Sequence, residues 1–439
     1  MKPFLKKLIY LLALAQTAGL WAGDFLIHDG DRVVFLGDSI TEQRLYTTYI
    51  EAYALTRHPE WKLTFRNVGW GGDTSWLRQR FHPDEKKLFA AEASAQQAMV
   101  EDAVSRGLER DVLPLKPTFI TIKFGMNDHS YQPFREDIFG AYVRSQAELA
   151  KELKAADARV AFLTPQPIEE KRPDPDKDAR NQSLRRFSDG LKEVAAKGGA
   201  DFVDQFDPYM KIMLNERAVN PTTMIGGGDA VHPGPPGHTI MAWAILKGLG
   251  ASASVSSAEV DSAAKKLGTT EACKISNLKF ADGSISFDRL DHCLPMPIDE
   301  RAEPALKLAP ILEDLDRYDL RVTGLAEGSY EVQIDGESAG KVSAEDLAKG
   351  WNLANAAGPV TKQARLVLKL IFDKNNLFFH RWRDIQLFSF PTWANGSEVE
   401  KKRAEEVAKL DKQIEALEGQ IQKARQPASH HFELKPGTL

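Results

Sequence analysis

Short apolar runs separated by amphipathic stretches fill the first half of the chain and constrain its fold more than any other feature. Each run is rich in β-branched or aromatic residues and is bounded by Gly, Pro or Asp, as in strands buried on both faces. The runs lie at residues 32–37, 63–69, 118–125, 159–165 and 201–206. Helical patterns accompany them at residues 84–112, 134–157, 181–198 and 237–250. This alternation predicts an α/β fold, with a parallel sheet between two layers of helices.

The sequence changes character after about residue 250. The segment "SNLKFADGSISF" alternates around an Asp-Gly turn, as a β-hairpin does, and "YDLRVTGLAEGSYEVQIDGESAGKVS" repeats the pattern. We interpret "ARLVLKLIFDKNNLFFHRWRDIQLFSF" as further strands, and the charged stretch 397–425 as a docking helix or short coiled coil. The small, polar segment "ASASVSSAEV" is taken as the boundary. The predicted units are residues 24–252, a β-rich accessory domain at 253–396, and a charged helix and tail at 397–439.

The N-terminus has the pattern of a secretory signal. Three lysines precede an apolar run from Leu8 to Leu20, and "WAGDF" follows with small residues. We expect residues 1–23 to be removed and the protein to be exported to the periplasm or the exterior. The alternative is an uncleaved anchor helix, for which the run is short. No other segment is expected to span a membrane.

The composition limits which partners the protein can bind and how many disulfides it can form. The formal net charge of −5 excludes the basic field of a nucleic-acid binder. Cys273 and Cys293 are the only cysteines. In an oxidising compartment they can form one disulfide. The alternative is two buried free thiols, and neither has a predicted catalytic role.

Four short motifs carry the residues with chemistry. They are "VVFLGDSITE" (33–42), "NVGWGGDTS" (67–75), "FGMNDH" (124–129) and "GGGDAVHPGPPGH" (226–238). The first three end predicted strands, and the fourth precedes the last helix. Because the carboxyl ends of parallel strands share one edge of a sheet, we expect Ser39, Asn127, Asp229 and His232 to lie close together there.

These residue types suit acyl transfer. A serine hydroxyl becomes a nucleophile when a base takes its proton, which His232 can do, with Asp229 orienting the imidazole. The N–H groups of Ser39 and Gly72 and the amide of Asn127 are candidate donors to an oxyanion.

Other interpretations of the same residues stay open. Ser39 can be an ordinary turn or helix-capping residue, Asn127 an Asx-turn residue, and Gly69 or Gly71 can take the place of Gly72. His238 is expected to be structural.

A metal site is the less favoured chemistry. Asp73, Asp128 and His129 lie near the predicted site in the sequence, but no metal-ligand spacing is present. The absence of G-x-S-x-G around Ser39 argues against the α/β-hydrolase fold.

In this order, the four motifs resemble those of the SGNH, or GDSL-type, hydrolase family, over about residues 30–250. Gly37-Asp38-Ser39 matches the nucleophile block, Gly72 the glycine, Asn127 the asparagine, and Asp229 with His232 the last block. The resemblance implies a flavodoxin-like α/β/α sandwich and ester hydrolysis without a metal or cofactor. The long second connection and the extra C-terminal half depart from the family pattern and leave the substrate open.

By this resemblance we expect an exported carbohydrate acetylesterase that acts on small-molecule or polysaccharide esters. The alternatives are a lipolytic acylhydrolase or thioesterase, and a non-catalytic envelope protein that binds carbohydrate. The aromatics of "HRWRD" (380–384), with Trp351 and Trp393, form either a sugar-stacking face or core. A chain that ends near residue 255 is expected to keep its activity on small esters. The oligomeric state is left open.

Overall fold

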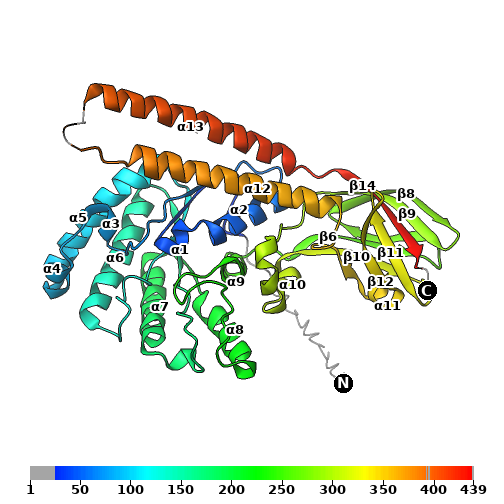
Figure 1. The fold of residues 1–439 in the computed structure, drawn as a ribbon, viewed down its shortest axis with the longest axis horizontal. Helices are drawn as coiled ribbons and strands as arrows, with labels where there is room; N and C mark the ends of the chain where they lie inside the picture. Colours follow the sequence, from blue (N-terminus) through cyan, green and yellow to red (C-terminus); the bar gives the residue numbers. More distant parts are fainter. Residues whose placement is uncertain (1–24, 392, 394–395, 438–439) are drawn as a thin grey trace, which may run out of the picture.

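A computed structural model describes residues 25–391, 393 and 396–437, so the predicted signal at 1–23 lies outside the described residues. Figure 1 shows an α/β half joined to a β-rich half, with two long helices running along the α/β half. In the part of the chain that the structure describes, no helix is long and apolar enough to cross a bilayer.

All five predicted strands of the first half form one parallel sheet. Its strand order is β2-β1-β3-β4-β5. The strands are β1 (Arg32–Gly37), β2 (Thr64–Asn67), β3 (Phe119–Lys123), β4 (Arg159–Leu163) and β5 (Asp201–Val203). The chain moves from β1 outward to β2 and then to the opposite side with β3, so the strand order reverses at β1. Ligands of open α/β sheets bind at the carboxyl edge beside such a reversal.

The sheet is covered on both faces, which explains why its strands are continuously apolar. In β1, Val33 and Phe35 join one core, whereas Val34 and Leu36 join the other. The helices of the first face are α2 (Leu45–Arg57), α8 (Phe206–Val219) and α9 (Pro235–Gly248). Those of the second are α5 (Ala93–Asp111), α6 (Glu136–Ala155) and α7 (Ala179–Gly198). The predicted flavodoxin-like α/β/α sandwich is confirmed. Short helices in the connections are α1 (Ser39–Glu42), α3 (Arg78–Phe81), α4 (Glu85–Ala90), η1 (Leu113–Leu115) and η2 (Pro175–Lys177).

The second half contains two further sheets. One has the order β13-β10-β6-β7, with β6 (Ser254–Asp261), β7 (Lys266–Glu271), β10 (Arg317–Thr323) and β13 (Trp351–Asn352). The other has the order β12-β11-β14-β9-β8, with β8 (Cys273–Ala281), β9 (Ser284–Asp291), β11 (Ser329–Ile334), β12 (Glu337–Ser343) and β14 (Ser429–Pro436). The sheets face each other, and the hydroxyl of Tyr318 in β10 donates to Asp291 in β9 at 2.8 Å. Their connections include η3 (Glu300–Lys307), α10 (Ile311–Leu315) and α11 (Ala344–Lys349).

Both predicted Asp-Gly turns are hairpin turns. Asp282 and Gly283 join β8 to β9, and Asp335 and Gly336 join β11 to β12. All four residues have positive φ, as a type I′ turn requires. The β-rich character of this half is therefore confirmed.

One prediction for the second half was wrong. The segment 364–390 does not form strands: it lies mostly in helix α12 (Pro359–Phe379) and the π-helix η4 (His380–Gln386). Its buried residues recur at helical spacing, but the run is apolar enough to resemble a buried strand as well. The segment "ASASVSSAEV", taken as the boundary, runs into β6, the first strand of the second half. The tail after residue 424 contains β14, a central strand of its sheet.

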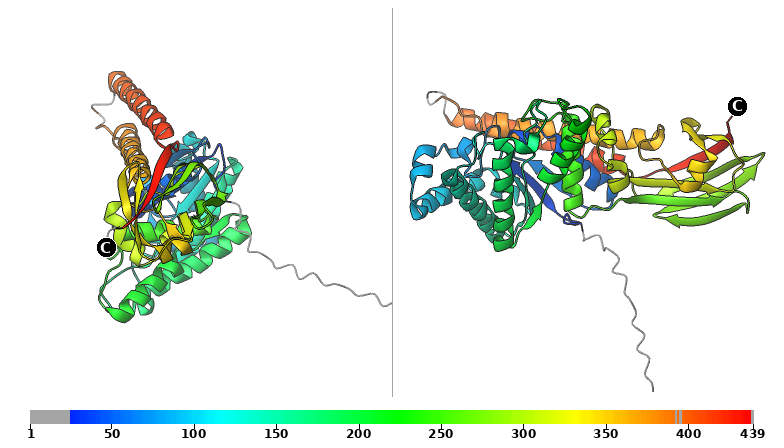
Figure 2. Two further views of the ribbon diagram at one scale, coloured as in Figure 1. Left: turned by 90° about the vertical axis from the view of Figure 1, so that its right-hand side faces the viewer. Right: turned by 90° about the horizontal axis from the view of Figure 1, so that it is seen from below.

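Helices α12 and α13 join the two halves. Figures 1 and 2 show α12 running from the β-rich half over the α/β half, and α13 (Ser397–Ala424) returning beside it to β14. The narrow apolar stripe of α13 buries Leu410, Ile414 and Ile421, as expected for a docking helix.

A cluster of buried polar side chains joins α12 to α2. The ammonium of Lys374 pairs with the carboxylate of Glu51, and Asn375 Nδ2 donates to Glu51 Oε2 at 2.9 Å and to Thr48 Oγ1 at 3.0 Å. All four side chains are buried. A chain ending near residue 255 would leave Glu51 without its cation, so the expectation that such a chain stands alone does not fit this packing.

The structure decides between the alternatives left open for the cysteines and for Trp382. Cys273 and Cys293 are both free and buried, with thiols directed at the Ser257 and Val255 carbonyls of β6, so the disulfide is absent. Trp382 of "HRWRD" is a buried core residue, which is the second of the two alternatives for that segment.

Candidate active site

Ser39 is the first residue of α1, directly after β1 and at the point where the strand order reverses. The helix is capped by Asp38, whose Oδ1 accepts a hydrogen bond from the Ile40 N–H at 3.0 Å. Ser39 is therefore not the capping residue, and its hydroxyl is available for another partner.

That partner is His232. Ser39 Oγ lies 2.9 Å from His232 Nε2, and His232 Nδ1 lies 3.2 Å from Asp229 Oδ2. Although 193 residues separate Ser39 from His232, the fold places serine, imidazole and carboxylate in one continuous row. With Nδ1–H donating to the carboxylate, Nε2 is the nitrogen free to accept the serine proton.

Asp229 is held by its own loop. Its Oδ1 accepts the backbone N–H groups of Val231 and His232, both at 2.7 Å. Partial burial alone would raise the pKa of Asp229, but these N–H groups and the His232 side chain outweigh it and lower the pKa. The Asp229 side chain is 67% exposed, so its charge acts on His232 through a solvated contact rather than a buried one.

Glu169 anchors the same loop, and the sequence analysis missed it. Its carboxylate accepts the N–H groups of Ile225 and Gly226, and its own N–H donates to the Ala230 carbonyl at 2.8 Å. Gln166 Nε2 donates to the carbonyl of Val231, the residue before His232, at 2.9 Å. A glutamate after the fourth strand carries no recognisable motif, so only its tertiary contacts identify it.

The glycine loop, residues 69–72, contains one backbone N–H group suited to bind an oxyanion. Gly72 has a φ of +74°, a conformation that side chains rarely adopt, and no described residue accepts a hydrogen bond from its N–H. Gly71 packs on Glu42, since a Cβ there would lie 2.7 Å from Glu42 Oε2, and Gly69 packs on the Glu42 backbone. These contacts give Gly69 and Gly71 packing roles and leave Gly72 as the candidate donor.

Asn127 is oriented from two sides. Its Nδ2 donates to the Asp73 carbonyl at 2.9 Å, and the Tyr131 hydroxyl donates to its Oδ1 at 2.9 Å. One N–H of the amide thus remains for an oxyanion. Tyr131 and Ser130 both have a φ of 54°, a left-handed backbone that non-glycine residues seldom adopt. Burial raises the pKa of Tyr131 to about 12, and the charges of nearby carboxylates, Asp229 among them, add to the effect.

The residues considered for a metal serve the loops instead. Asp73 pairs with Arg80 Nε at 2.9 Å, Asp128 accepts the Ser75 and Gly125 N–H groups at 2.9 Å, and His129 Nδ1 lies 3.1 Å from the Gly125 carbonyl. Burial raises the pKa of Asp128 to about 6 and lowers that of His129 to about 4. Over the described ranges, no three acidic, His or Cys side chains cluster as metal ligands.

His238 is structural, as the sequence analysis expected. It is fully buried, accepts the Tyr46 N–H at Nδ1 (3.2 Å), and therefore donates from Nε2 to Gln43 Oε1 (2.8 Å). Burial lowers its pKa to about 3, and the nearby charge of Lys123 adds to this.

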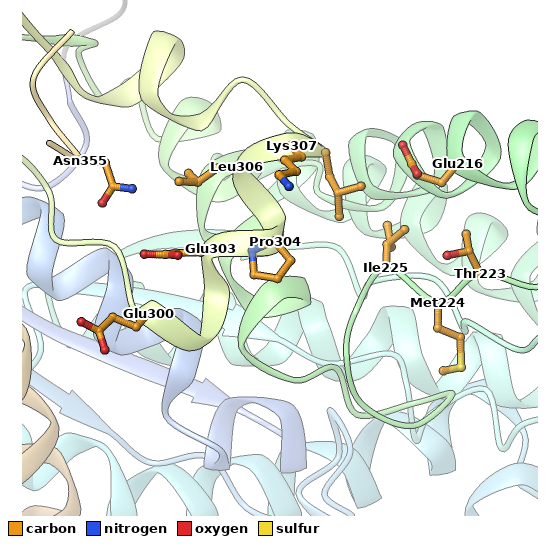
Figure 3. Close-up of a pocket in the computed structure, with 11 residues that line it drawn as sticks. Glu216, Thr223, Met224, Ile225, Glu300, Glu303, Pro304, Leu306, Lys307 and Asn355 are labelled. Carbon is orange, nitrogen blue, oxygen red and sulfur yellow. The ribbon is translucent and has the colours of Figure 1, made fainter. Parts of the chain in front are cut away.

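A cavity of about 810 Å³ lies apart from these residues. Figure 3 shows it between the α8 side of the α/β half, with Glu216 and Met224, and η3 of the second half, with Glu303 and Lys307. Its lining contains none of the predicted site residues.

Comparisons with known proteins identify the family of the first half. Residues 35–240 match the GDSL-like Lipase/Acylhydrolase family. An acetylxylan esterase of Geobacillus stearothermophilus is 26% identical over 232 residues, which are 51% of this chain and 96% of that protein. The solved structure of BT4096, a gut microbial diltiazem-metabolizing enzyme, is 26% identical with a TM-score of 0.77. It covers 94% of this chain, and the match covers 98% of BT4096.

The BT4096 match extends through the β-rich half and the two long helices, so the whole architecture recurs in that enzyme. Residues 35–240 form a domain of the GDSL-like Lipase/Acylhydrolase family, and the protein is a carboxylic ester hydrolase.

Proposed function

We propose that this protein is an acetylesterase in which Ser39, His232 and Asp229 form the catalytic triad. The observation that carries the proposal is the 2.9 Å contact between Ser39 Oγ and His232 Nε2, with Asp229 at the other ring nitrogen. This is the arrangement that activates a serine hydroxyl at neutral pH.

The reaction follows from these positions. His232 Nε2 takes the Ser39 proton as Oγ attacks the ester carbonyl carbon. The resulting oxyanion accepts hydrogen bonds from the N–H groups of Ser39 and Gly72 and from Asn127 Nδ2. When the intermediate collapses, His232 returns the proton to the leaving alcohol and an acyl-serine remains. Water, deprotonated by His232, then releases the acid and restores Ser39.

The substrate is proposed to be an acetylated carbohydrate. The relative from Geobacillus stearothermophilus is an acetylxylan esterase, which supports a short acyl group on a sugar. Tyr131 donates to Asn127. Burial raises the pKa of Tyr131, and the charges of Asp38, the residue before Ser39, and of Asp229 add to the effect. A polar surrounding of this kind suits a hydroxylated leaving group better than a long acyl chain. A lipolytic enzyme would require an extended apolar groove beside Ser39. We further propose export, on the basis of the predicted signal at residues 1–23.

The test is an acyl-length and leaving-group screen with purified protein. We expect kcat/KM to be highest for p-nitrophenyl acetate and at least about tenfold lower for the octanoate, because extra methylenes find no apolar pocket. Acetate should also be released from acetylated xylooligosaccharides and from the acetate ester diltiazem. A preference for octanoate would favour the lipolytic alternative. If none of these esters is hydrolysed, the proposal is wrong.

A further inference from the structure

Side chains of the C-terminal half pack on the glycine loop (residues 69–72), and Arg383 makes the shortest of these contacts. The guanidinium carbon of Arg383, in η4, lies 3.2 Å from the centroid of the Trp70 ring. Trp70 immediately precedes Gly71 and Gly72, and its N–H donates to the Gly37 carbonyl at 2.9 Å. Arg383 therefore stacks on the residue that fixes the loop to the end of β1.

Trp70 is enclosed from several sides. Its ring meets Trp382 edge-on at 5.9 Å, and the guanidinium carbons of Arg80 and Arg110 lie 5.2 and 5.3 Å from its centroid. Arg80 is tied to Asp73, directly after Gly72, so both ends of the loop are fixed. Only Trp382 and Arg383 of this enclosure come from outside the α/β half.

The end of α12, just before η4, contacts the turn on the other side of the loop. Arg44 Nε donates to Asn376 Oδ1 at 3.1 Å, and the Arg44 guanidinium lies 4.2 Å from the Phe379 ring centroid. Arg44 has a left-handed φ of 60° and donates to the Glu42 carbonyl at 2.6 Å. Asn376 and Phe379 thus stabilise the turn that places Glu42 against Gly71.

Charge complements this packing. Burial raises the pKa of Glu42, and the positive charge of Arg383 is the strongest influence against it, so the two groups are close. Among the described residues, no carboxylate is in ion-pair contact with Arg383 itself. The Arg383 guanidinium therefore interacts with the Trp70 ring and, through its charge, with Glu42. Arg381, two residues earlier, instead pairs with Asp411 of α13 at 2.9 Å.

We propose that η4 positions the glycine loop, and that Arg383 acts through Trp70 to hold the Gly72 N–H in its catalytic orientation. The inference rests on the proposed function, because it assigns a role in the same ester hydrolysis. Arg383 is a positioning residue: it touches Trp70 and not the reacting atoms. π-helices are rare and occur often at functional sites, which agrees with this placement.

The test compares Arg383→Gln with the matched control Arg381→Gln on p-nitrophenyl acetate. Removing an oxyanion donor lowers kcat by about 10²-fold, and displacing it should lower kcat by less. We therefore expect kcat of Arg383→Gln to fall about tenfold, with KM within twofold of the wild-type value. Arg381→Gln should keep the wild-type kcat. An unchanged kcat in Arg383→Gln, or an equal loss in Arg381→Gln, would overturn the inference.

A double variant tests the route through Trp70. If Arg383 acts through that ring, Trp70→Leu/Arg383→Gln should be no slower than Trp70→Leu alone, and additive losses would contradict this. If Arg383→Gln does not fold, Arg383→Lys takes its place, because it keeps the charge near Glu42 but lacks the planar face; an intact kcat in that variant would also contradict the stacking role. Wild type and Ser39→Ala are assayed in parallel. An inactive wild type would refute the proposed function, whereas an active wild type beside an unaffected Arg383→Gln refutes only this inference.

Discussion

The hydroxyl of Tyr131 donates a hydrogen bond to Oδ1 of Asn127 at 2.9 Å, while Nδ2 of the same amide donates to the Asp73 carbonyl. The two contacts fix the orientation of the amide and leave one of its N–H groups for another acceptor. Tyr131 lies four positions after Asn127, and the chain takes a left-handed conformation at both Ser130 and Tyr131. Backbone strain that persists beside the proposed oxyanion donor agrees with a functional role for this contact.

Tyr131→Phe should therefore lower kcat without unfolding the protein. The variant loses one neutral hydrogen bond, worth about 0.5–1.5 kcal/mol, so we expect a loss of about 3- to 10-fold in kcat. Asn127→Ala, which removes the donor itself, should cost about 10²–10³-fold. Steady-state kinetics of both variants on p-nitrophenyl acetate measure the two losses. Equal rates for Tyr131→Phe and wild type would show that the Asp73 carbonyl alone orients the amide.

Lys374→Met should destabilise the protein by about 3–5 kcal/mol, because it leaves the Glu51 carboxylate buried without its cation. The double variant Glu51→Leu/Lys374→Met removes both charges and should recover most of the loss. Urea unfolding of the two variants and wild type gives the free energies. A single-variant cost below about 1 kcal/mol would mean that the pair contributes little to the packing of α12 on α2.

A chain ending at residue 255 should not form a stable, active domain. It lacks Lys374 and Asn375, which bind the polar side chains of α2. It also lacks Trp382 and Arg383, which pack on Trp70 in the glycine loop. The measurement is the cooperative thermal transition and the esterase activity of the truncated chain. A sharp transition with wild-type activity would show that the α/β half needs none of these contacts.

His238 should make stability pH-dependent. Its pKa in the folded protein is about 3, below the ordinary value of about 6.5 that it regains on unfolding. As the pH falls below 6.5, the unfolded chain binds a proton that the folded protein does not, so this residue lowers the stability by about 2 kcal/mol at pH 5. His238→Gln removes the effect. The stability difference between wild type and variant should shrink by that amount from pH 8 to pH 5, and a constant difference would contradict the assignment.

The predictable part of this molecule is the part set by local pattern. The strands of the parallel sheet are short apolar runs with clear ends, and the rule that parallel strands share a carboxyl edge was enough to bring Ser39 and His232 together. The motif positions followed from the same rule, since each lies where an element begins or ends.

The rest depends on contacts between distant residues. A run such as 364–371 is apolar enough for either a buried strand or a helix, and only its burial against α2 decides for α12. The buried pair of Lys374 with Glu51 and the stacking of Arg383 on Trp70 join residues more than 300 positions apart. The exposure of Asp229 and the free state of Cys273 likewise depend on tertiary geometry.

The central claim is that Ser39 Oγ is the nucleophile that carries the acyl group. Mass spectrometry of protein quenched in acid during turnover of p-nitrophenyl acetate tests it most directly, because an ester on serine survives acid. We predict one added acetyl group on the peptide that contains Ser39 in the wild type. It should be absent from Ser39→Ala, which should fold as the wild type does, and from His232→Ala, which lacks the base that activates Ser39. Hydrolysis by Ser39→Ala at the wild-type rate, or an acetyl group on another residue, would contradict the account.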